Sequence, residues 1–98
     1  NKLDWYLISQ YQTLSESFIT EYEDNVIWFK IYEYQKLSEG YIRKFSKKVD
    51  WYCMSRYQTL SESFIREFAD KVFWSTIFQY QKLSEPFRKE FQYKLQSI

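Results

Sequence analysis

The chain of 98 residues contains no histidine, one glycine, one proline and one cysteine. Without histidine it lacks the residue that most often serves as a general base or a metal ligand. One glycine excludes a glycine-rich phosphate loop, and one cysteine excludes the spacing of a zinc finger. Four glutamates recur at intervals of 23 residues together with the rest of the sequence, so they do not indicate one distinct active-site pocket: Glu16, Glu39, Glu62 and Glu85. We therefore expect a non-enzyme that binds no metal and no cofactor.

The lone cysteine, Cys53, cannot form a disulfide within the chain, which favours a reducing, intracellular compartment. Its counterparts in the repeats described below are Leu7, Lys30 and Thr76, so the position accepts diverse side chains and is expected to be exposed. No apolar run approaches the roughly 18–20 residues that cross a bilayer, so we expect no membrane span.

Four tryptophans recur at intervals of 23 residues, and most of the chain keeps the same period. They are Trp5, Trp28, Trp51 and Trp74, each followed at constant distances by tyrosine, glutamine and a Leu-Ser-Glu run. A fixed period of this size is typical of a solenoid. We divide the single expected domain, 1–98, into repeats 3–25, 26–48, 49–71 and 72–94, with the start of a fifth at 95–98. Because neither end carries a polar capping repeat, we expect a segment of a longer array.

Each repeat is predicted to form two short helices. Its first half has apolar residues at helical spacing, as Trp5, Ile8 and Tyr11 show in the first repeat. Its second half starts at the Leu-Ser-Glu run, where serine is a preferred N-cap and glutamate complements the helix dipole. The capping serines are expected to be Ser15, Ser38, Ser61 and Ser84. Helices of roughly 8–10 residues are marginal alone, so neighbouring repeats must stabilise them. The predicted fold is all-α, an α-solenoid of about four two-helix repeats.

A glutamine recurs on the helix face that we assign to the core. A buried amide without partners costs about 1–3 kcal/mol. We therefore expect each glutamine to bond the adjacent turn or its equivalent in the next repeat, a structural role shared with the tryptophan and serine columns. The alternative is a row of amides that reads a ligand. The column consists of Gln12, Gln35, Gln58 and Gln81.

The tyrosine one position earlier is expected at the edge of the core. The alternative is a set of platforms that stack on nucleobases. This column consists of Tyr11, Tyr34, Tyr57 and Tyr80.

Charge varies strongly between repeats, although the net charge of the chain is +1. The first repeat has five acidic residues and no base, whereas the second has six bases against two acids. Opposite charges favour contact between repeats or head-to-tail pairing. They favour a nucleic-acid groove less, because such a groove needs a continuous basic track.

The predicted function is a scaffold that binds a protein or peptide partner through positions that vary between repeats. These positions lie on the outer face of the first helix and at the turn after it: Leu7, Lys30, Cys53 and Thr76; Gln10, Glu33, Arg56 and Gln79; Thr13, Lys36, Thr59 and Lys82. The alternation of threonine and lysine in the last set favours a period of two repeats. Two alternative functions stay open. Helical repeats can read nucleic acid base by base, and uncapped apolar ends can stack into an end-to-end structural assembly.

The string Trp-x-x-Ile/Met-x-x-Tyr-Gln-x-Leu-Ser-Glu-x-Phe-Ile runs from Trp5 to Ile19 and recurs at the equivalent positions. It resembles the short tandem helical repeats of uncharacterised proteins predicted in large DNA viruses and some microbial genomes. The resemblance covers the whole chain and brings no catalytic residues. It implies an intracellular or virion-associated interaction protein. Arg88, where the other repeats have isoleucine, departs from the pattern and is expected to mark a locally altered surface.

Overall fold

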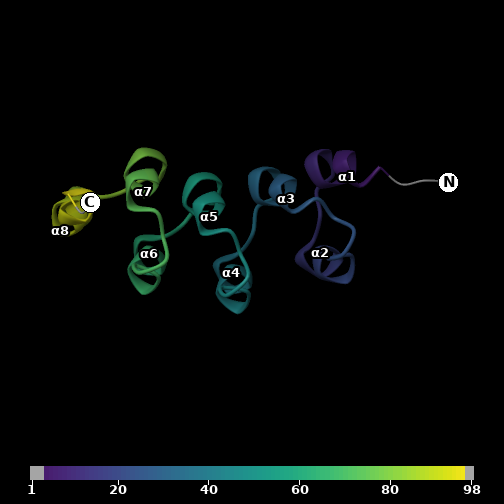
Figure 1. Ribbon diagram of the computed structural model, residues 1–98, viewed down its shortest axis with the longest axis horizontal. Coiled ribbons are helices and arrows are strands. Elements are labelled where there is room, and N and C mark those ends of the chain that lie inside the picture. Colours follow the sequence, from purple (N-terminus) through teal and green to yellow (C-terminus); the bar gives the residue numbers. More distant parts are fainter. Residues whose placement is uncertain (1–3, 97–98) are drawn as a thin grey trace. The chain divides into compact units, whose positions relative to one another are not determined.

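The computed structural model describes residues 4–96, which form eight α-helices, one 3₁₀-helix and no strand (Figure 1). The first helices of the repeats are α1 (Trp5–Tyr11), α3 (Trp28–Tyr34), α5 (Trp51–Tyr57) and α7 (Trp74–Tyr80). The second helices are α2 (Glu16–Glu21), α4 (Glu39–Lys44), α6 (Glu62–Glu67) and α8 (Glu85–Phe91), after which η1 (Gln92–Gln96) follows. The predicted all-α array of two-helix repeats is confirmed. Each α-helix has six or seven residues, fewer than expected.

The chain divides into two compact units, residues 1–48 and 49–98. The division falls where the second repeat ends and the third begins, so each unit holds one pair of repeats. In the first unit α1 packs against α3, and in the second α5 packs against α7. The expected repeat limit at Leu3 and the last residues of the expected fifth repeat, Ser97 and Ile98, lie outside the described residues.

Every second helix starts at a serine N-cap. The Oγ atoms of Ser15, Ser38, Ser61 and Ser84 accept hydrogen bonds from the backbone N–H three residues later, at 3.1–3.3 Å. Such a cap satisfies one of the four N–H groups that a helix leaves unpaired at its start. The Leu-Ser-Glu run therefore determines where the second helix of each repeat begins.

The first helices start in two different ways. Asp4 and Asp50 cap α1 and α5 through their side chains. The N-caps of α3 and α7 are apolar and make no side-chain cap bond. Instead, the backbone N–H of Ile27 donates to Ser9 Oγ at 2.9 Å, and that of Phe73 donates to Ser55 Oγ at 3.0 Å. In the second and fourth repeats, the backbone N–H at the start of the first helix is thus bonded by a serine side chain of the preceding repeat.

Trp5, Trp51 and Trp74 lie against the second helix of their own repeat. Trp74 stacks on Phe91 with ring centroids 4.7 Å apart, and Trp5 lies 5.3 Å from Tyr22. The indoles are half-buried, whereas deeper side chains such as Phe64 and Ile19 are 1% exposed. Each tryptophan therefore covers the core instead of forming its centre.

Indole N–H groups also join neighbouring repeats. Trp28 Nε1 donates to the backbone oxygen of Glu23 at 3.0 Å, and Trp74 Nε1 donates to that of Ala69 at 2.9 Å. Both acceptors lie in the turn that ends the preceding repeat. A tryptophan in an even repeat therefore holds two repeats in register.

A glutamine bridge connects the repeats inside each unit. Gln81 Nε2 donates to the backbone oxygens of Ser55 (2.9 Å) and Gln58 (2.6 Å), while its Oε1 accepts from Leu60 N at 3.0 Å. Gln35 makes the same three bonds one unit earlier, to Ser9, Gln12 and Leu14. Gln81 is 7% exposed and Gln35 is 6% exposed. The amide that pairs buried backbone groups is thus supplied by the following repeat.

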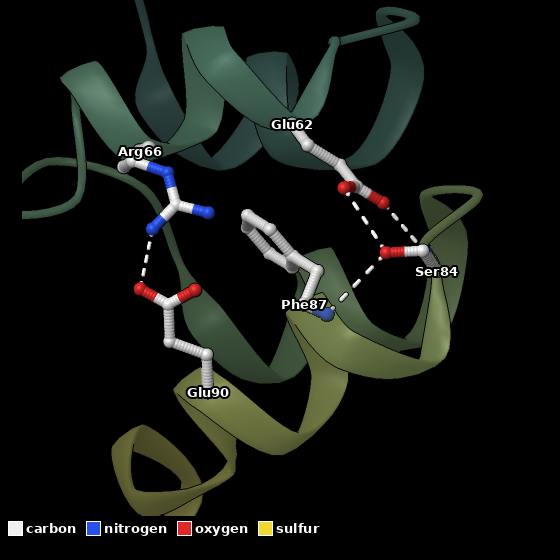
Figure 2. Close-up of polar contacts among 5 residues, drawn as sticks. All are labelled: Glu62, Arg66, Ser84, Phe87 and Glu90. Carbon is white, nitrogen blue, oxygen red and sulfur yellow. Dashed lines mark hydrogen bonds and ion pairs between the residues drawn. The ribbon is translucent and has the colours of Figure 1, made fainter.

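A glutamate of the earlier repeat bonds the serine cap of the later one. Glu62 Oε2 accepts from Ser84 N at 2.6 Å, and Glu62 Oε1 accepts from Ser84 Oγ at 3.1 Å (Figure 2). Glu16 makes the same pair of bonds with Ser38, at 2.6 and 3.1 Å. These bonds, the glutamine bridge and the serine at positions 9 and 55 recur in both units, so the two units are built alike.

Candidate functional site

Exposed apolar side chains gather on the first helices. Eleven large hydrophobic residues are exposed among the described residues, and nine of them lie on a first helix or at its N-cap. The other two lie in η1, so the described second helices contribute none. We call the nine the first-helix surfaces: Tyr6, Leu7, Tyr11, Phe29 and Tyr34 in the first unit, and Tyr52, Tyr57, Phe73 and Tyr80 in the second.

Helix geometry explains why these residues face outward. Successive residues lie about 100° apart around the helix axis, so the residue after each tryptophan points away from the side on which the indole packs. Tyr6, Phe29 and Tyr52 occupy this position. The sequence reasoning missed this column, although its signal, an aromatic residue directly after three of the four tryptophans, was available.

The tyrosine column is also exposed. Its members are 38–70% exposed, with Tyr57 the most covered and Tyr11 the least. Tyr34, Tyr57 and Tyr80 are thus partly covered, as expected at the edge of the core, whereas Tyr11 is largely exposed. Each first helix ends at this tyrosine. The next residue is the glutamine, and in Gln35 and Gln81 its side chain points toward the preceding repeat.

Lys30 lies among the exposed aromatic rings of the first unit. Lys30 Nζ lies 4.6 Å from the ring centroid of Tyr6, 5.4 Å from that of Phe29 and 5.2 Å from that of Tyr34. Ammonium groups within about 6 Å of a ring face are attracted to it. A hydrogen bond with the Tyr6 hydroxyl raises the pKa of Lys30, and the neighbouring Glu33 adds to the rise. Lys30 is thus a fixed positive charge among three exposed rings.

An arginine does the same in the second unit. Arg56 Cζ lies 4.3 Å from the ring centroid of Tyr80 and 5.0 Å from that of Tyr57, and Nη1 donates to the Tyr80 hydroxyl. Hydrogen bonds with Tyr57 and then Tyr80 raise the pKa of Arg56. Both units therefore present tyrosine rings around one cation, at different positions of the repeat.

The structure places the predicted contact residues as follows. Leu7 is 49% exposed, and Glu33, Gln79, Thr13, Lys36, Thr59 and Lys82 are exposed as well. Gln10, Lys30, Cys53 and Arg56 are half-buried. Thr76 is 8% exposed, so its assignment to the outer face is wrong. Lys30, in the same column, lies over Tyr6 of the preceding first helix. Lys30 is long enough to reach out across Tyr6, whereas the short threonine stays covered.

Residues 4–96 contain neither a cluster of candidate metal ligands nor a membrane-spanning helix. Among residues 4–96 no group of three or more acidic or cysteine residues is placed to hold a metal ion. In the same range no helix has the length and apolar character needed to cross a membrane. Comparison with protein-family models, curated proteins and solved structures found no match to this chain. The resemblance to viral and microbial repeats, and the intracellular or virion-associated location, therefore stay predictions.

Proposed function

We propose that the chain is a non-catalytic scaffold that binds a protein or peptide partner on its first-helix surfaces. The observation that supports this most is the restriction of exposed aromatic side chains to those helices and η1 in the described chain. Rings of this kind are enriched where proteins bind one another, because they bury a large area at low entropic cost. Scattered exposed apolar residues would carry no such meaning, but a repeated set on one class of helix does.

The charges on these surfaces indicate the partner's chemistry. Lys30, Lys36, Arg56 and Lys82 belong to the first helices and their turns, against Glu33 and the N-cap residues Asp4 and Asp50. A segment that carries carboxylates beside leucine or aromatic side chains complements such a surface. The partner we propose is therefore an acidic, partly apolar protein segment.

Nucleic acid is the weaker candidate for the same surfaces. Base stacking needs an open ring face, but Lys30 and Arg56 already lie over five of the exposed rings. A base could stack there only after the cation had moved away. Protein contacts can use the ring edges and hydroxyl groups without that rearrangement.

Selection of a random peptide library on the chain tests the proposal. We expect enriched peptides with Asp or Glu next to apolar residues. Their affinity should fall at least about tenfold in the double variant Arg56→Ala, Tyr80→Ala, as for removal of an interface hot spot. The control is Lys89→Ala, an exposed cation on α8. Equal loss in both variants would contradict the proposal. Displacement of the peptides by single-stranded oligonucleotides, with a steep loss of affinity at high salt, would replace it with nucleic-acid binding.

End-to-end association is a second candidate function, favoured by two residues at the outer repeats. The side chain of Gln12 is exposed, whereas its equivalents Gln35 and Gln81 are buried in bridges. Leu95 is 46% exposed, whereas the equivalent Val26 is 6% exposed. Another copy's end could cover these groups. Light scattering at low and high salt decides: mass that grows with concentration supports association, and a constant monomer mass excludes it.

A further inference from the structure

A groove of about 630 Å³ opens between α2 and α4 in the first unit. Thr20, Tyr41 and Lys44 line it, together with the carboxylates of Glu16 and Glu21. The groove lies on second helices, away from the first-helix surfaces. It therefore offers a separate place for a ligand.

The matching place in the second unit is occupied by an arginine. Arg66 stands two repeats after Thr20, and its Cζ lies 5.5 Å from the ring centroid of Phe87 and 5.2 Å from that of Phe91. Its guanidinium forms an ion pair with Glu90. Figure 2 shows the guanidinium beside the ring of Phe87, with the Glu90 carboxylate facing it. The second unit thus shows how this pair of helices holds a guanidinium: by two ring faces and one carboxylate.

The first unit keeps the ring pair but lacks the arginine. Tyr41 and Phe45 take the places of Phe87 and Phe91, and their centroids are 4.8 Å apart, against 4.7 Å in the second unit. Thr20 is too short to cover these rings as Arg66 covers theirs. The groove therefore includes the space that a guanidinium fills in the other unit, although the ammonium groups of Lys44 and Lys48 already lie 5.5 and 5.9 Å from the ring centroid of Phe45.

The charge around the groove is mixed, because carboxylates favour a cation and two lysines oppose it. Burial raises the pKa of Tyr41, a hydrogen bond with Thr20 opposes the rise, and the charges of Glu16 and Glu23 add to it. These carboxylates place a negative field at the Tyr41 hydroxyl. Lys44, however, stands where the second unit has Glu90. Its charge and that of Lys48, which both lie over Phe45, oppose an incoming cation. The isolated site is therefore expected to be weak.

We propose that this groove binds an arginine side chain of a partner protein, with its guanidinium in the place that Arg66 holds in the second unit. The inference does not rest on the function proposed for the first-helix surfaces, because the two sites use different helices. Its test therefore stands or fails separately.

The test uses the short peptide acetyl-Gly-Arg-Gly-amide and a two-dimensional ¹H–¹⁵N spectrum of the full chain. Gly40 lines the groove and is the only glycine, so its amide signal is readily identified. We expect a saturable shift of this signal at millimolar peptide. The same peptide with citrulline, which keeps the shape and lacks the charge, should bind about fivefold more weakly, as for loss of an exposed cation–π contact. Absence of a saturable shift, or equal binding of the citrulline peptide, would overturn the proposal.

Two variants place the binding in the groove. Thr20→Arg supplies the guanidinium from within the chain and should abolish the Gly40 shift. Lys44→Glu restores the carboxylate found in the second unit and should strengthen binding about fivefold, in line with replacing a repulsive charge by an ion pair. Unchanged or weaker binding in Lys44→Glu contradicts the proposal even if Thr20→Arg fails to fold. A matched control, Lys71→Glu in the second unit, should leave binding unchanged.

Discussion

Replacing Gln81 by alanine should destabilise the second unit far more than the same change at Gln12. Gln81 is 7% exposed and makes three hydrogen bonds to the preceding repeat. Gln12 occupies the same position of the first repeat, but its side chain is exposed. The pair therefore separates the effect of the bridge from the effect of the residue type.

The magnitude follows from the groups that the change leaves behind. Gln81→Ala removes the acceptor of Leu60 N, whose residue is 4% exposed, and both donors to the carbonyls of Ser55 and Gln58. An orphaned buried donor costs about 1–3 kcal/mol, and each hydrogen bond contributes about 1 kcal/mol net. Water that enters the vacated space recovers part of this. We expect a loss of about 2–4 kcal/mol for Gln81→Ala and less than about 0.5 kcal/mol for Gln12→Ala.

Urea unfolding, followed by tryptophan fluorescence and by circular dichroism, measures these changes. Free energies are compared only where the two probes give coincident transitions. Gln81→Glu has nearly the same shape but cannot donate to the two carbonyls, so it should be at least as harmful as alanine. Gln35→Ala repeats the test in the first unit. Equal effects of Gln81→Ala and Gln12→Ala, or a harmless Gln81→Glu, would refute the idea that the bridge stabilises the repeat pair.

Three further predictions use the same unfolding assay. Ser55→Ala removes a buried hydroxyl that pairs two backbone groups and should cost about 1–2 kcal/mol, whereas Ser75→Ala, at an exposed position of α7, should be neutral; similar values for both would contradict this role. Gly40→Ala should stabilise the chain by about 0.5–1 kcal/mol, because the new Cβ meets nothing closer than 3.9 Å; destabilisation would show strain that the structure does not contain. Glu62→Ala should cost about 1 kcal/mol through loss of two bonds to the next repeat, and Glu85→Ala, at the same position of the last described repeat, should cost less; the reverse order would argue against this contact.

The sequence predicts the fold because its periodicity is repeated four times. The tryptophan interval, the apolar spacing and the serine N-caps each indicate a two-helix repeat, and they agree with one another. Helix length is predicted less well, since the turn after each second helix takes residues that continue the apolar pattern. Periodicity alone cannot show where a helical stretch gives way to a turn.

The polar contacts between repeats are harder to predict. Gln35 and Gln81 bond the preceding repeat because that repeat lies within hydrogen-bond distance. A column of glutamines in the sequence does not show whether the preceding or the following repeat is the partner. The serine at positions 9 and 55 is identical in type to many surface serines, yet both are 0% exposed. Its role becomes evident only when the apolar N-caps Ile27 and Phe73 are seen to lack a cap of their own.

The candidate surface overlaps the predicted contact columns in part. Variable columns identify Lys30 and Arg56, which lie among the exposed rings, but also Thr76, which is buried. Variation between repeats shows only that a position accepts different side chains. A covered position between two helices accepts a threonine, and it also accepts a lysine that is long enough to reach outward. The exposed column of Tyr6, Phe29 and Tyr52 was missed because aromatic side chains in a repeat are first assigned to the core.

The polar contacts between repeats explain how such short helices can expose so many rings. Glutamine bridges, glutamate–serine bonds and indole N–H bonds fix the register of neighbouring repeats through backbone groups. The register therefore does not require every aromatic side chain to be buried. Six- and seven-residue helices cannot hold a surface in place by themselves. Here they are held by the neighbouring repeat, so the first helices can expose tyrosine and phenylalanine, the side chains that we propose bind a partner. The groove on the second helices can likewise differ between units without loss of the fold.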